Sequence, residues 1–281
     1  MTALTTIEID DGNGPALQLL HARADRPDAP AMLLVHGAYT SAQCWAPTFM
    51  PFFRSRGYDV YAVSLRGHGG SKGKSRLDVT GLSDYLDDIQ RAACRIGRLP
   101  VLIGSSMGGL LVQRWLTAGR AAKAAVLLGS VPPSGLSAAA MQMAFSNPQA
   151  FAELAQLAIA GSVNPGLMSL LCDNPLEDRL LKPFYRELGR ESTRALWEST
   201  WAPMVGWINS RCPVLAVHGE NDRMVPVESV RMMSARLNAE VVRLPDVGHL
   251  PMVDQDWMQA ADVIDGWLRK LCPAAQPAAA A

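Results

Sequence analysis

Short apolar runs alternate along the chain with longer segments in which apolar residues recur with helical spacing. The short runs cover 32–36, 59–63, 101–104, 125–128, 214–218 and 240–244. The amphipathic segments cover 82–96, 107–118, 229–237 and 257–271. Near-continuous apolar strands connected by amphipathic helices are typical of a parallel sheet with helices on both faces. The pattern therefore predicts an α/β fold.

An earlier pair of apolar runs, 5–9 and 17–21, predicts a β-hairpin. The connection between them contains Asp-Gly-Asn-Gly, and these residue types favour a tight turn between antiparallel strands. We therefore expect an antiparallel pair at one edge of a mostly parallel central sheet of about eight strands.

The alternation stops between residues 134 and 207, where no strand-like run occurs and prolines interrupt the helical segments. The first half of this interval, 134–172, contains a single charged residue, Glu153. An apolar helical insertion of this kind is predicted to cover a cavity, and the alternative is a group of ordinary helices buried against the core. The predicted organisation is a core of residues 1–133 and 208–272, a helical cap of 134–207 and a flexible tail of 273–281.

Composition excludes several classes of partner. The chain has 281 residues, and its 26 Lys and Arg balance 26 Asp and Glu, so the formal net charge is zero. Nucleic-acid binding and polybasic membrane attachment both need an excess of basic residues, and neither is expected here. Hydrophobic residues make up 49% of the chain and charged residues 19%, as in folded globular proteins. We therefore expect a small or uncharged partner.

The sequence also indicates the compartment. No uninterrupted apolar stretch is long enough to span a bilayer, and the first residues lack the basic and apolar regions of a signal peptide. The five cysteines are widely spaced and include no Cys-x-x-Cys pair, which disfavours a disulfide framework or a zinc site. We therefore expect a cytoplasmic protein with reduced thiols and without stable membrane insertion.

A Gly-x-Ser-x-Gly motif, from Gly104 to Gly108, follows the run 101–104 and opens the helical segment 107–118. In this strand–turn–helix context Ser106 occupies the position of a nucleophile, because the turn is so tight that residues two positions before and after it must be small. The motif is short enough to occur by chance, so a glycine-rich turn that serves packing alone is the alternative interpretation.

A serine hydroxyl becomes nucleophilic when a base removes its proton and an acid orients that base. Of the five histidines, His249 lies on a short polar loop after the last strand-like run and is the predicted base. The acid should follow another strand, and the run 214–218 is followed by two carboxylates, Glu220 and Asp222. Asp246 is a weaker third candidate. Turn formation is the alternative role for each of these carboxylates.

Acyl transfer also needs N–H donors aimed at the oxyanion of the tetrahedral intermediate. Met107 follows the nucleophile at the start of a helix and offers one backbone N–H. The loop after the run 32–36 offers a second at Ala38, with Gly37 allowing the backbone to turn. His36 is expected to brace this loop by hydrogen bonding.

Taken together, these segments resemble the α/β-hydrolase superfamily, and within it the small capped esterases and lysophospholipase-like serine hydrolases. The matching segments are LVHGA at 34–38, SLRGHGGS at 64–71, LIGSSMGG at 102–109, VHGENDRMVP at 217–226 and LPDVGH at 244–249. Ser105 is a departure, because many relatives carry histidine at that position. Haloalkane dehalogenases and epoxide hydrolases of this fold use an aspartate nucleophile, whereas this chain has Ser106. His68 is expected to be structural.

The resemblance implies the α/β-hydrolase fold with a helical cap and assigns the site residue by residue. Ser106 is the implied nucleophile, His249 the base and Asp222 the acid, while Ala38 and Met107 are the implied oxyanion donors. The expected activity is hydrolysis of a carboxylic ester through an acyl-enzyme, as in serine esterases and lipases. No metal and no organic cofactor is implied.

The substrate is expected to be a small ester with an apolar acyl or alcohol group, because the cap is rich in methionine and aromatic residues. The predicted substrate-binding residues are Tyr39, Met141, Phe145 and Trp201. Other reactions of the same catalytic residues stay open, namely C–C bond hydrolysis, thioester cleavage, perhydrolysis and acyl transfer. A ligand receptor without catalysis is a further alternative, and the sequence is compatible with a monomer or a homodimer.

Overall fold

The computed structural model describes residues 4–146, 148–149, 151–152, 155–156, 171–201 and 212–271. Within them, eight strands form one sheet in the order β1-β2-β4-β3-β5-β6-β7-β8. The strands are β1 (Thr5–Ile9), β2 (Leu17–Ala22), β3 (Ala31–Val35), β4 (Asp59–Val63), β5 (Val101–Ser105), β6 (Ala124–Leu128), β7 (Val214–Gly219) and β8 (Glu240–Leu244). Each predicted run differs from its strand by at most one residue at either end. The predicted α/β fold is confirmed.

The sheet is parallel except at one edge. There β1 and β2 form the predicted antiparallel pair, and β2 is also antiparallel to β4. The remaining neighbours run parallel, with Val35 of β3 opposite Gly104 of β5 and Ser105 of β5 opposite Leu128 of β6. This register brings the carboxyl ends of the central strands to one edge of the sheet, where ligands bind in open α/β folds.

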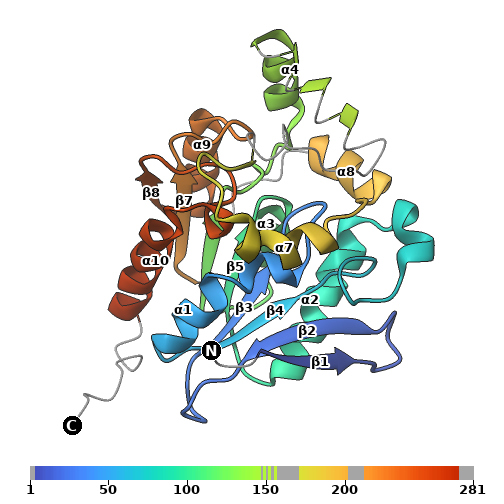
Figure 1. Ribbon diagram of the computed structural model, residues 1–281, viewed down its shortest axis with the longest axis vertical. Helices are drawn as coiled ribbons and strands as arrows, with labels where there is room; N and C mark the ends of the chain where they lie inside the picture. The colour runs from blue at the N-terminus through green and yellow to red at the C-terminus, as the bar shows by residue number, and fades with distance from the viewer. Residues whose placement is uncertain are drawn as a thin grey trace.

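Helices cover both faces of the sheet (Figure 1). The helices described are α1 (Phe49–Ser55), α2 (Leu82–Ile96), α3 (Met107–Thr117), α4 (Ser137–Ser146), α7 (Asp178–Glu187), α8 (Thr193–Thr200), α9 (Val227–Leu237) and α10 (Trp257–Leu271), with short 3-10 helices η1 (Ala42–Trp45), η2 (Lys74–Val79) and η3 (Pro251–Val253). The sequence pattern did not predict α1, because Phe49, Met50 and Phe53 bury most of a short helix that also contains Pro51. Proline is compatible with the first turn of a helix.

Two apolar cores lie on opposite faces of the sheet, and β3 shows how they are separated. Met32 and Leu34 belong to the core under α1 and α10, whereas Leu33 and Val35 belong to the core under α2, α3 and α9. Every residue of β3 is buried, because successive side chains of a strand point to opposite faces and both faces are covered.

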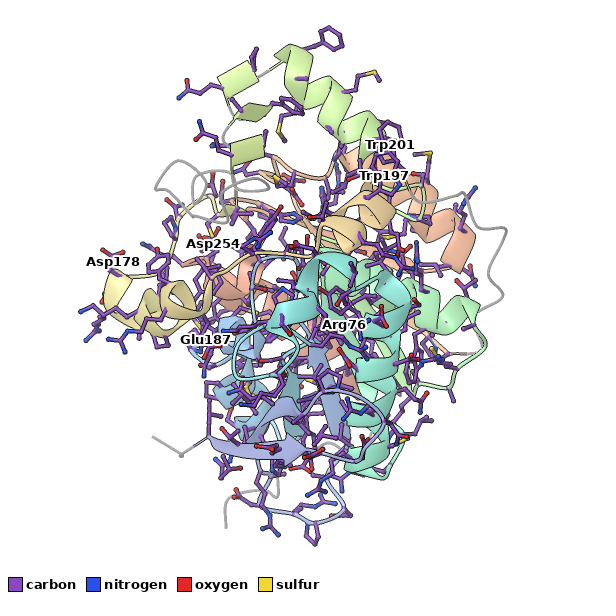
Figure 2. All side chains as sticks on the ribbon, turned by 90° about the vertical axis from the view of Figure 1, so that its right-hand side faces the viewer. Arg76, Asp178, Glu187, Trp197, Trp201 and Asp254 are labelled. Atoms are coloured by element: carbon purple, nitrogen blue, oxygen red, sulfur yellow. The ribbon has the colours of Figure 1, made fainter. Side chains whose placement is uncertain are left out.

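Between β6 and β7 the described residues form α4, α7 and α8 and no strand. Figure 1 shows α4 and α8 beyond one end of the sheet, and in Figure 2 Trp197 and Trp201 lie toward α4 while Asp178 and Glu187 mark the ends of α7. The division into a core and a cap stays a prediction, and the predicted tail, 273–281, lies outside the described residues. No helix in the described ranges is both long and apolar enough to cross a membrane.

Candidate active site

Ser106 lies on a sharp turn between β5 and α3. Its backbone angles are φ 54° and ψ −119°, a conformation that residues other than glycine rarely adopt. A β-carbon at Gly104 would lie 2.3 Å from the carbonyl oxygen of Gly108, and a β-carbon at Gly108 would lie 2.3 Å from the carbonyl oxygen of Val35. The two glycines therefore let the turn close tightly, which lifts the Ser106 side chain beyond the end of the strand.

Ser106, His249 and Asp222 form a continuous chain of hydrogen bonds. The Ser106 Oγ lies 2.9 Å from His249 Nε2, and His249 Nδ1 lies 2.9 Å from Asp222 Oδ2. The other carboxylate oxygen of Asp222 accepts the backbone N–H groups of Met224, at 2.8 Å, and Val225, at 2.9 Å. Because a carboxylate only accepts, His249 carries its hydrogen on Nδ1, which leaves Nε2 free to accept the serine proton.

Of the three candidate acids, the structure brings Asp222 to His249. Burial alone raises the pKa of Asp222, but His249, His218 and the backbone N–H of Val225 together outweigh it and hold that pKa below its ordinary value. Glu220 lies 3.9 Å from Arg243 with 47% of its side chain exposed. Asp246 is exposed on the loop after β8. Asp222 therefore stays ionised next to the imidazole.

Two glycines allow the loop that carries His249 to cross the ends of β6 and β7. A β-carbon at Gly129, whose φ is +51°, would lie 2.5 Å from the carbonyl oxygen of His249 and 3.5 Å from Asp222 Oδ2. A β-carbon at Gly219 would lie 2.1 Å from the carbonyl oxygen of Val247. The sequence analysis did not assign a role to either glycine, although a glycine directly at a strand end was an available signal.

The two expected oxyanion donors, Ala38 and Met107, belong to segments that lie close to Ser106. Ala38 and Met107 both line the cavity described below, and neither backbone N–H has a hydrogen-bond acceptor in the described part of the chain. A β-carbon at Gly37 would lie 2.9 Å from the β-carbon of Ser106, so this loop approaches the serine closely. Both N–H groups are therefore candidate donors to an oxyanion formed at Ser106.

His36 braces the loop that carries Ala38. The backbone N–H of Leu65 donates to His36 Nε2 at 3.0 Å, so Nδ1 carries the hydrogen and donates to the carbonyl oxygen of Gly37 at 2.8 Å. Burial, with the neighbouring His68 ring, lowers the pKa of His36 to about 3. His36 is therefore neutral and bridges two loops at the ends of β3 and β4.

The model of the alpha/beta hydrolase family matches residues 32–263 of this chain. The chain belongs to the alpha/beta hydrolase family. It is 26% identical over 241 residues to a monoacylglycerol lipase of Mycolicibacterium smegmatis, covering 77% of this chain and 80% of the lipase. It is 28% identical over 256 residues to a non-heme chloroperoxidase of Burkholderia pyrrocinia, covering 79% of this chain and 86% of that protein. An esterase structure from Exiguobacterium antarcticum superposes with a TM-score of 0.71 at 14% identity, covering 94% of this chain and 100% of the esterase, and this likeness shows the fold.

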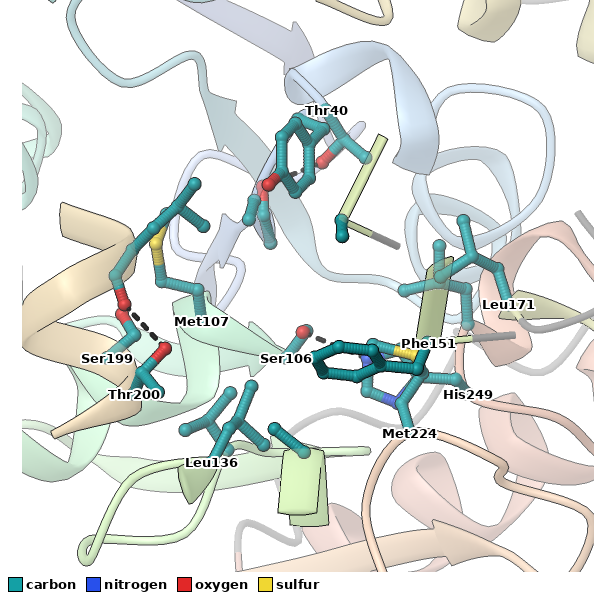
Figure 3. A pocket seen from close by; sticks show the side chains of 18 of the residues that line it. Thr40, Ser106, Met107, Leu136, Phe151, Leu171, Ser199, Thr200, Met224 and His249 are labelled. Carbon is teal, nitrogen blue, oxygen red and sulfur yellow. Dashed lines mark hydrogen bonds between the residues drawn. The ribbon is translucent and has the colours of Figure 1, made fainter. Parts of the chain in front are cut away.

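In this alpha/beta hydrolase, a cavity of about 410 Å³ opens onto Ser106. Its wall includes Ser106, His249, Leu136, Leu171 and Met224 (Figure 3). Most of its other lining residues belong to the loop after β3, to the segments around α4 and to those around α8, while Met107 begins α3 and Leu250 follows His249. These other residues are Gly37, Ala38, Tyr39, Thr40, Met107, Val131, Ala140, Phe151, Ala155, Leu188, Leu196, Ser199, Thr200, Trp201 and Leu250. Among the described residues the lining contains no Asp, Glu, Lys or Arg, and it suits an uncharged ligand.

Of the four predicted substrate-binding residues, two line the cavity and two do not. Tyr39 and Trp201 line the cavity. Met141 and Phe145 do not, because they project from α4 into solvent with exposed fractions of 61% and 84%. Positions four apart share one face of a helix, so these two residues point the same way, and Ala140 is the residue of α4 that reaches the cavity.

A buried carboxylate that no sequence motif indicated, Asp254, lies against the loop that carries His249. Asp254 accepts the backbone N–H of Gly248 at 3.3 Å and that of Asp173 at 2.9 Å, so it ties the His249 loop to the segment before α7. Burial raises the pKa of Asp254. No local pattern marks this residue, since its partner is far away in the sequence. In the described ranges, no three His, Cys, Asp or Glu side chains converge to hold a metal ion.

Proposed function

We propose that this alpha/beta hydrolase hydrolyses carboxylic esters through an acyl-enzyme formed on Ser106. The observation that carries the proposal is the pair of 2.9 Å hydrogen bonds linking Ser106, His249 and Asp222 at the edge of an uncharged cavity. A nucleophile, a base in hydrogen-bond contact and an acid that orients the base are the three groups that acyl transfer to serine needs.

In the first half of the reaction, Ser106 Oγ attacks the ester carbonyl carbon while His249 Nε2 takes the hydroxyl proton. The backbone N–H groups of Ala38 and Met107 donate to the oxyanion, and each donor is worth about 3 kcal/mol of barrier in comparable enzymes. His249 then returns the proton to the departing alkoxide, so the alcohol leaves and the acyl group stays on Ser106. In the second half, His249 deprotonates water, which attacks the acyl carbonyl and releases the carboxylic acid.

The proposed substrate is a small, uncharged ester with an apolar acyl or alcohol group. The cavity volume of about 410 Å³ lies within the range of small-molecule sites. Apolar and aromatic side chains, among them Tyr39, Leu136, Phe151 and Trp201, supply most of its wall. The name of one sequence relative, a monoacylglycerol lipase, supports an ester substrate.

The test combines turnover with covalent labelling. Wild type and Ser106→Ala are compared on nitrophenyl acetate, butyrate, octanoate and palmitate, and both are treated with a fluorophosphonate probe followed by peptide mass spectrometry. The expected result is hydrolysis and labelling of the peptide containing Ser106 in wild type, and neither in the variant. Unlabelled wild type together with undiminished activity in Ser106→Ala would overturn the proposal.

Perhydrolysis is a second candidate, favoured by the relative named as a non-heme chloroperoxidase. Hydrogen peroxide would then replace water in the second half of the reaction, attack the acyl group on Ser106 and release a peroxy acid, with His249 taking the peroxide proton. Adding hydrogen peroxide to the ester assay measures the partition directly. A product that is mainly carboxylic acid at millimolar peroxide favours the esterase, whereas a product that is mainly peroxy acid favours the perhydrolase.

A further inference from the structure

A second cluster of charged side chains is buried behind the loop that carries Ala38, outside the catalytic chain of Ser106. At its centre is the carboxylate of Glu191, which lies between α7 and α8 and is fully buried. It accepts the Tyr85 hydroxyl at 2.5 Å, the backbone N–H of Ser192 at 2.7 Å and the backbone N–H of Tyr39 at 3.3 Å. The fourth neighbour is His68, whose Nε2 lies 3.1 Å from Glu191 Oε2.

The contacts of His68 favour the protonated form of its ring. Its Nδ1 lies 3.1 Å from the carbonyl oxygen of Arg66, which only accepts, and its Nε2 faces a carboxylate, so both nitrogens carry hydrogens. Burial alone lowers the pKa of His68, but Glu191 outweighs it and raises that pKa above its ordinary value. Burial raises the pKa of Glu191, and His68 outweighs this effect and lowers it. Glu191 is therefore an ionised acceptor with donors on both oxygens.

The peptide group between Gly37 and Ala38 is held from the core side. Its carbonyl oxygen, on Gly37, accepts His36 Nδ1–H at 2.8 Å and the Thr40 hydroxyl at 2.9 Å. In a trans peptide the N–H points opposite to the C=O, so fixing this carbonyl fixes the direction of the Ala38 N–H. The next peptide group, between Ala38 and Tyr39, donates its N–H to Glu191. Both peptide groups that meet at Ala38 are thereby constrained, one from the core and one from the segment before α8.

Tyr39 shows that the second constraint is needed. Its φ is +64°, a left-handed conformation that a residue other than glycine holds only where surrounding contacts impose it. Besides donating to Glu191, Tyr39 accepts the backbone N–H of Gly189 through its carbonyl oxygen at 3.1 Å, and the hydroxyl of the nearby Ser41 donates to Glu187. Hydrogen bonds with residues 187–191 therefore hold the loop at Tyr39 and at the nearby Ser41.

We propose that Glu191 is a positioning residue for the oxyanion hole, which holds the Ala38 N–H in place through the Tyr39 backbone. The inference rests on the proposed function, because it presumes that the Ala38 N–H stabilises an oxyanion. Glu191 neither contacts Ser106 nor lines the cavity itself, and its link to the oxyanion donor runs through the Tyr39 backbone. An oxyanion exists in the transition state and not in the bound ester, so loss of Glu191 lowers kcat and leaves KM nearly unchanged.

The test uses Glu191→Gln, which keeps the shape of the side chain but offers one oxygen in place of two. The matched control is Glu198→Gln. Glu198 lies within α8 and accepts the backbone N–H of Leu82, and among the described residues it has no hydrogen bond to the loop that carries Ala38. Wild-type turnover and Ser106 labelling are measured first, and their absence defeats the proposed function itself. With both present, Glu191→Gln is expected to lose about 10-fold to 100-fold in kcat, with KM within about twofold.

Two inhibitors distinguish a loss of oxyanion stabilisation from a general weakening of binding in the cavity. A trifluoromethyl ketone with an apolar chain adds Ser106 to its carbonyl and forms an oxyanion, whereas the corresponding secondary alcohol only occupies the cavity. In Glu191→Gln the ketone is expected to bind about 10-fold more weakly and the alcohol unchanged. Equal weakening of both ligands, or wild-type kcat in folded Glu191→Gln, overturns the inference.

If Glu191→Gln does not fold, as judged by circular dichroism and thermal unfolding, a second variant provides the test. Glu191→Asp keeps a negative charge opposite His68 while drawing the carboxylate back from the Tyr39 N–H. It is expected to show the same loss in kcat at unchanged KM. Wild-type kcat in folded Glu191→Asp overturns the inference in the same way.

Discussion

Gly104 and Gly108 face each other across the turn that carries Ser106, and a β-carbon on Gly104 would come within 2.3 Å of the Gly108 carbonyl oxygen. The obstacle is backbone, which cannot rotate away as a flexible side chain can. The strand on one side of the turn is central in the sheet, and the helix on the other is packed on β3 and β6. The spacing of these two glycines is therefore a steric requirement of the turn.

Gly104→Ala is expected to destabilise the protein by about 1–3 kcal/mol and to reduce ester turnover sharply, because the turn must open and displace Ser106. The control is Gly266→Ala in α10, where an added β-carbon meets no atom within 4 Å. Removing a helical glycine should stabilise the protein by about 0.5–1 kcal/mol. Urea denaturation measures both effects, and a Gly104→Ala protein as stable as wild type would contradict the steric account.

Asp222→Asn is expected to reduce turnover by about 10⁴-fold while leaving the fold intact. An asparagine oxygen can still accept the N–H groups of Met224 and Val225, but the amide no longer holds the hydrogen of His249 on Nδ1. Glu220→Gln changes the neighbouring, half-exposed carboxylate and should keep wild-type turnover. Steady-state kinetics on a nitrophenyl ester decides between them. A loss of only a few fold in Asp222→Asn, with a large loss in Glu220→Gln, would transfer the acid role to Glu220.

Stability should fall as the pH drops from 7 to 5, because His36 is neutral in the folded protein. Its folded pKa of about 3 lies below the unfolded value of 6.5, so the unfolded chain binds more protons between these two values. His36 alone then accounts for about 2 kcal/mol of lost stability at pH 5. Burial also lowers the pKa of His218, which adds to the same trend.

Urea denaturation of wild type and His36→Gln at pH 7 and pH 5 measures how much of this loss of stability is due to His36. The variant is less stable at pH 7, since it loses the brace between two loops, but its stability should fall by about 2 kcal/mol less on acidification. His68 affects stability in another pH range. Its folded pKa is raised, so the stability that it contributes is lost as the pH rises above 6.5 toward that folded pKa. An identical pH dependence in both proteins would show that His36 is protonated in the folded state.

Trp201→Ala should impair the hydrolysis of longer acyl esters, whereas Phe145→Ala should not. Trp201 lines the cavity, while Phe145 is 84% exposed on α4 and lines none of it. Loss of the indole surface is expected to lower kcat/KM for octanoate by about 10-fold relative to acetate. Chain-length profiles of both variants provide the measurement. A Phe145→Ala profile that changes as much as that of Trp201→Ala would place the acyl chain on the outer face of α4.

The sequence predicted the sheet well, because its signals are local. An apolar run bounded by turn residues can be recognised as a strand without knowing which strands pair with it. Each predicted run therefore matches its strand to within one residue at either end. The signal for the turn that carries Ser106 is local as well, since the distance between Gly104 and Gly108 depends only on that turn. The helix α1 was missed because burial of adjacent aromatic residues, and not periodicity, places it on the sheet.

The sequence by itself determined the fold and the residues able to act at its strand ends, because strand period, turn glycines and residue order depend on chemistry within a few positions. Only the tertiary structure decided which carboxylate meets His249, that Met141 and Phe145 face solvent, and that Glu191 reaches the Tyr39 backbone across 152 positions of chain. These relations depend on how distant segments pack. Packing is settled by the summed burial and hydrogen bonding of the whole chain, which no local pattern contains.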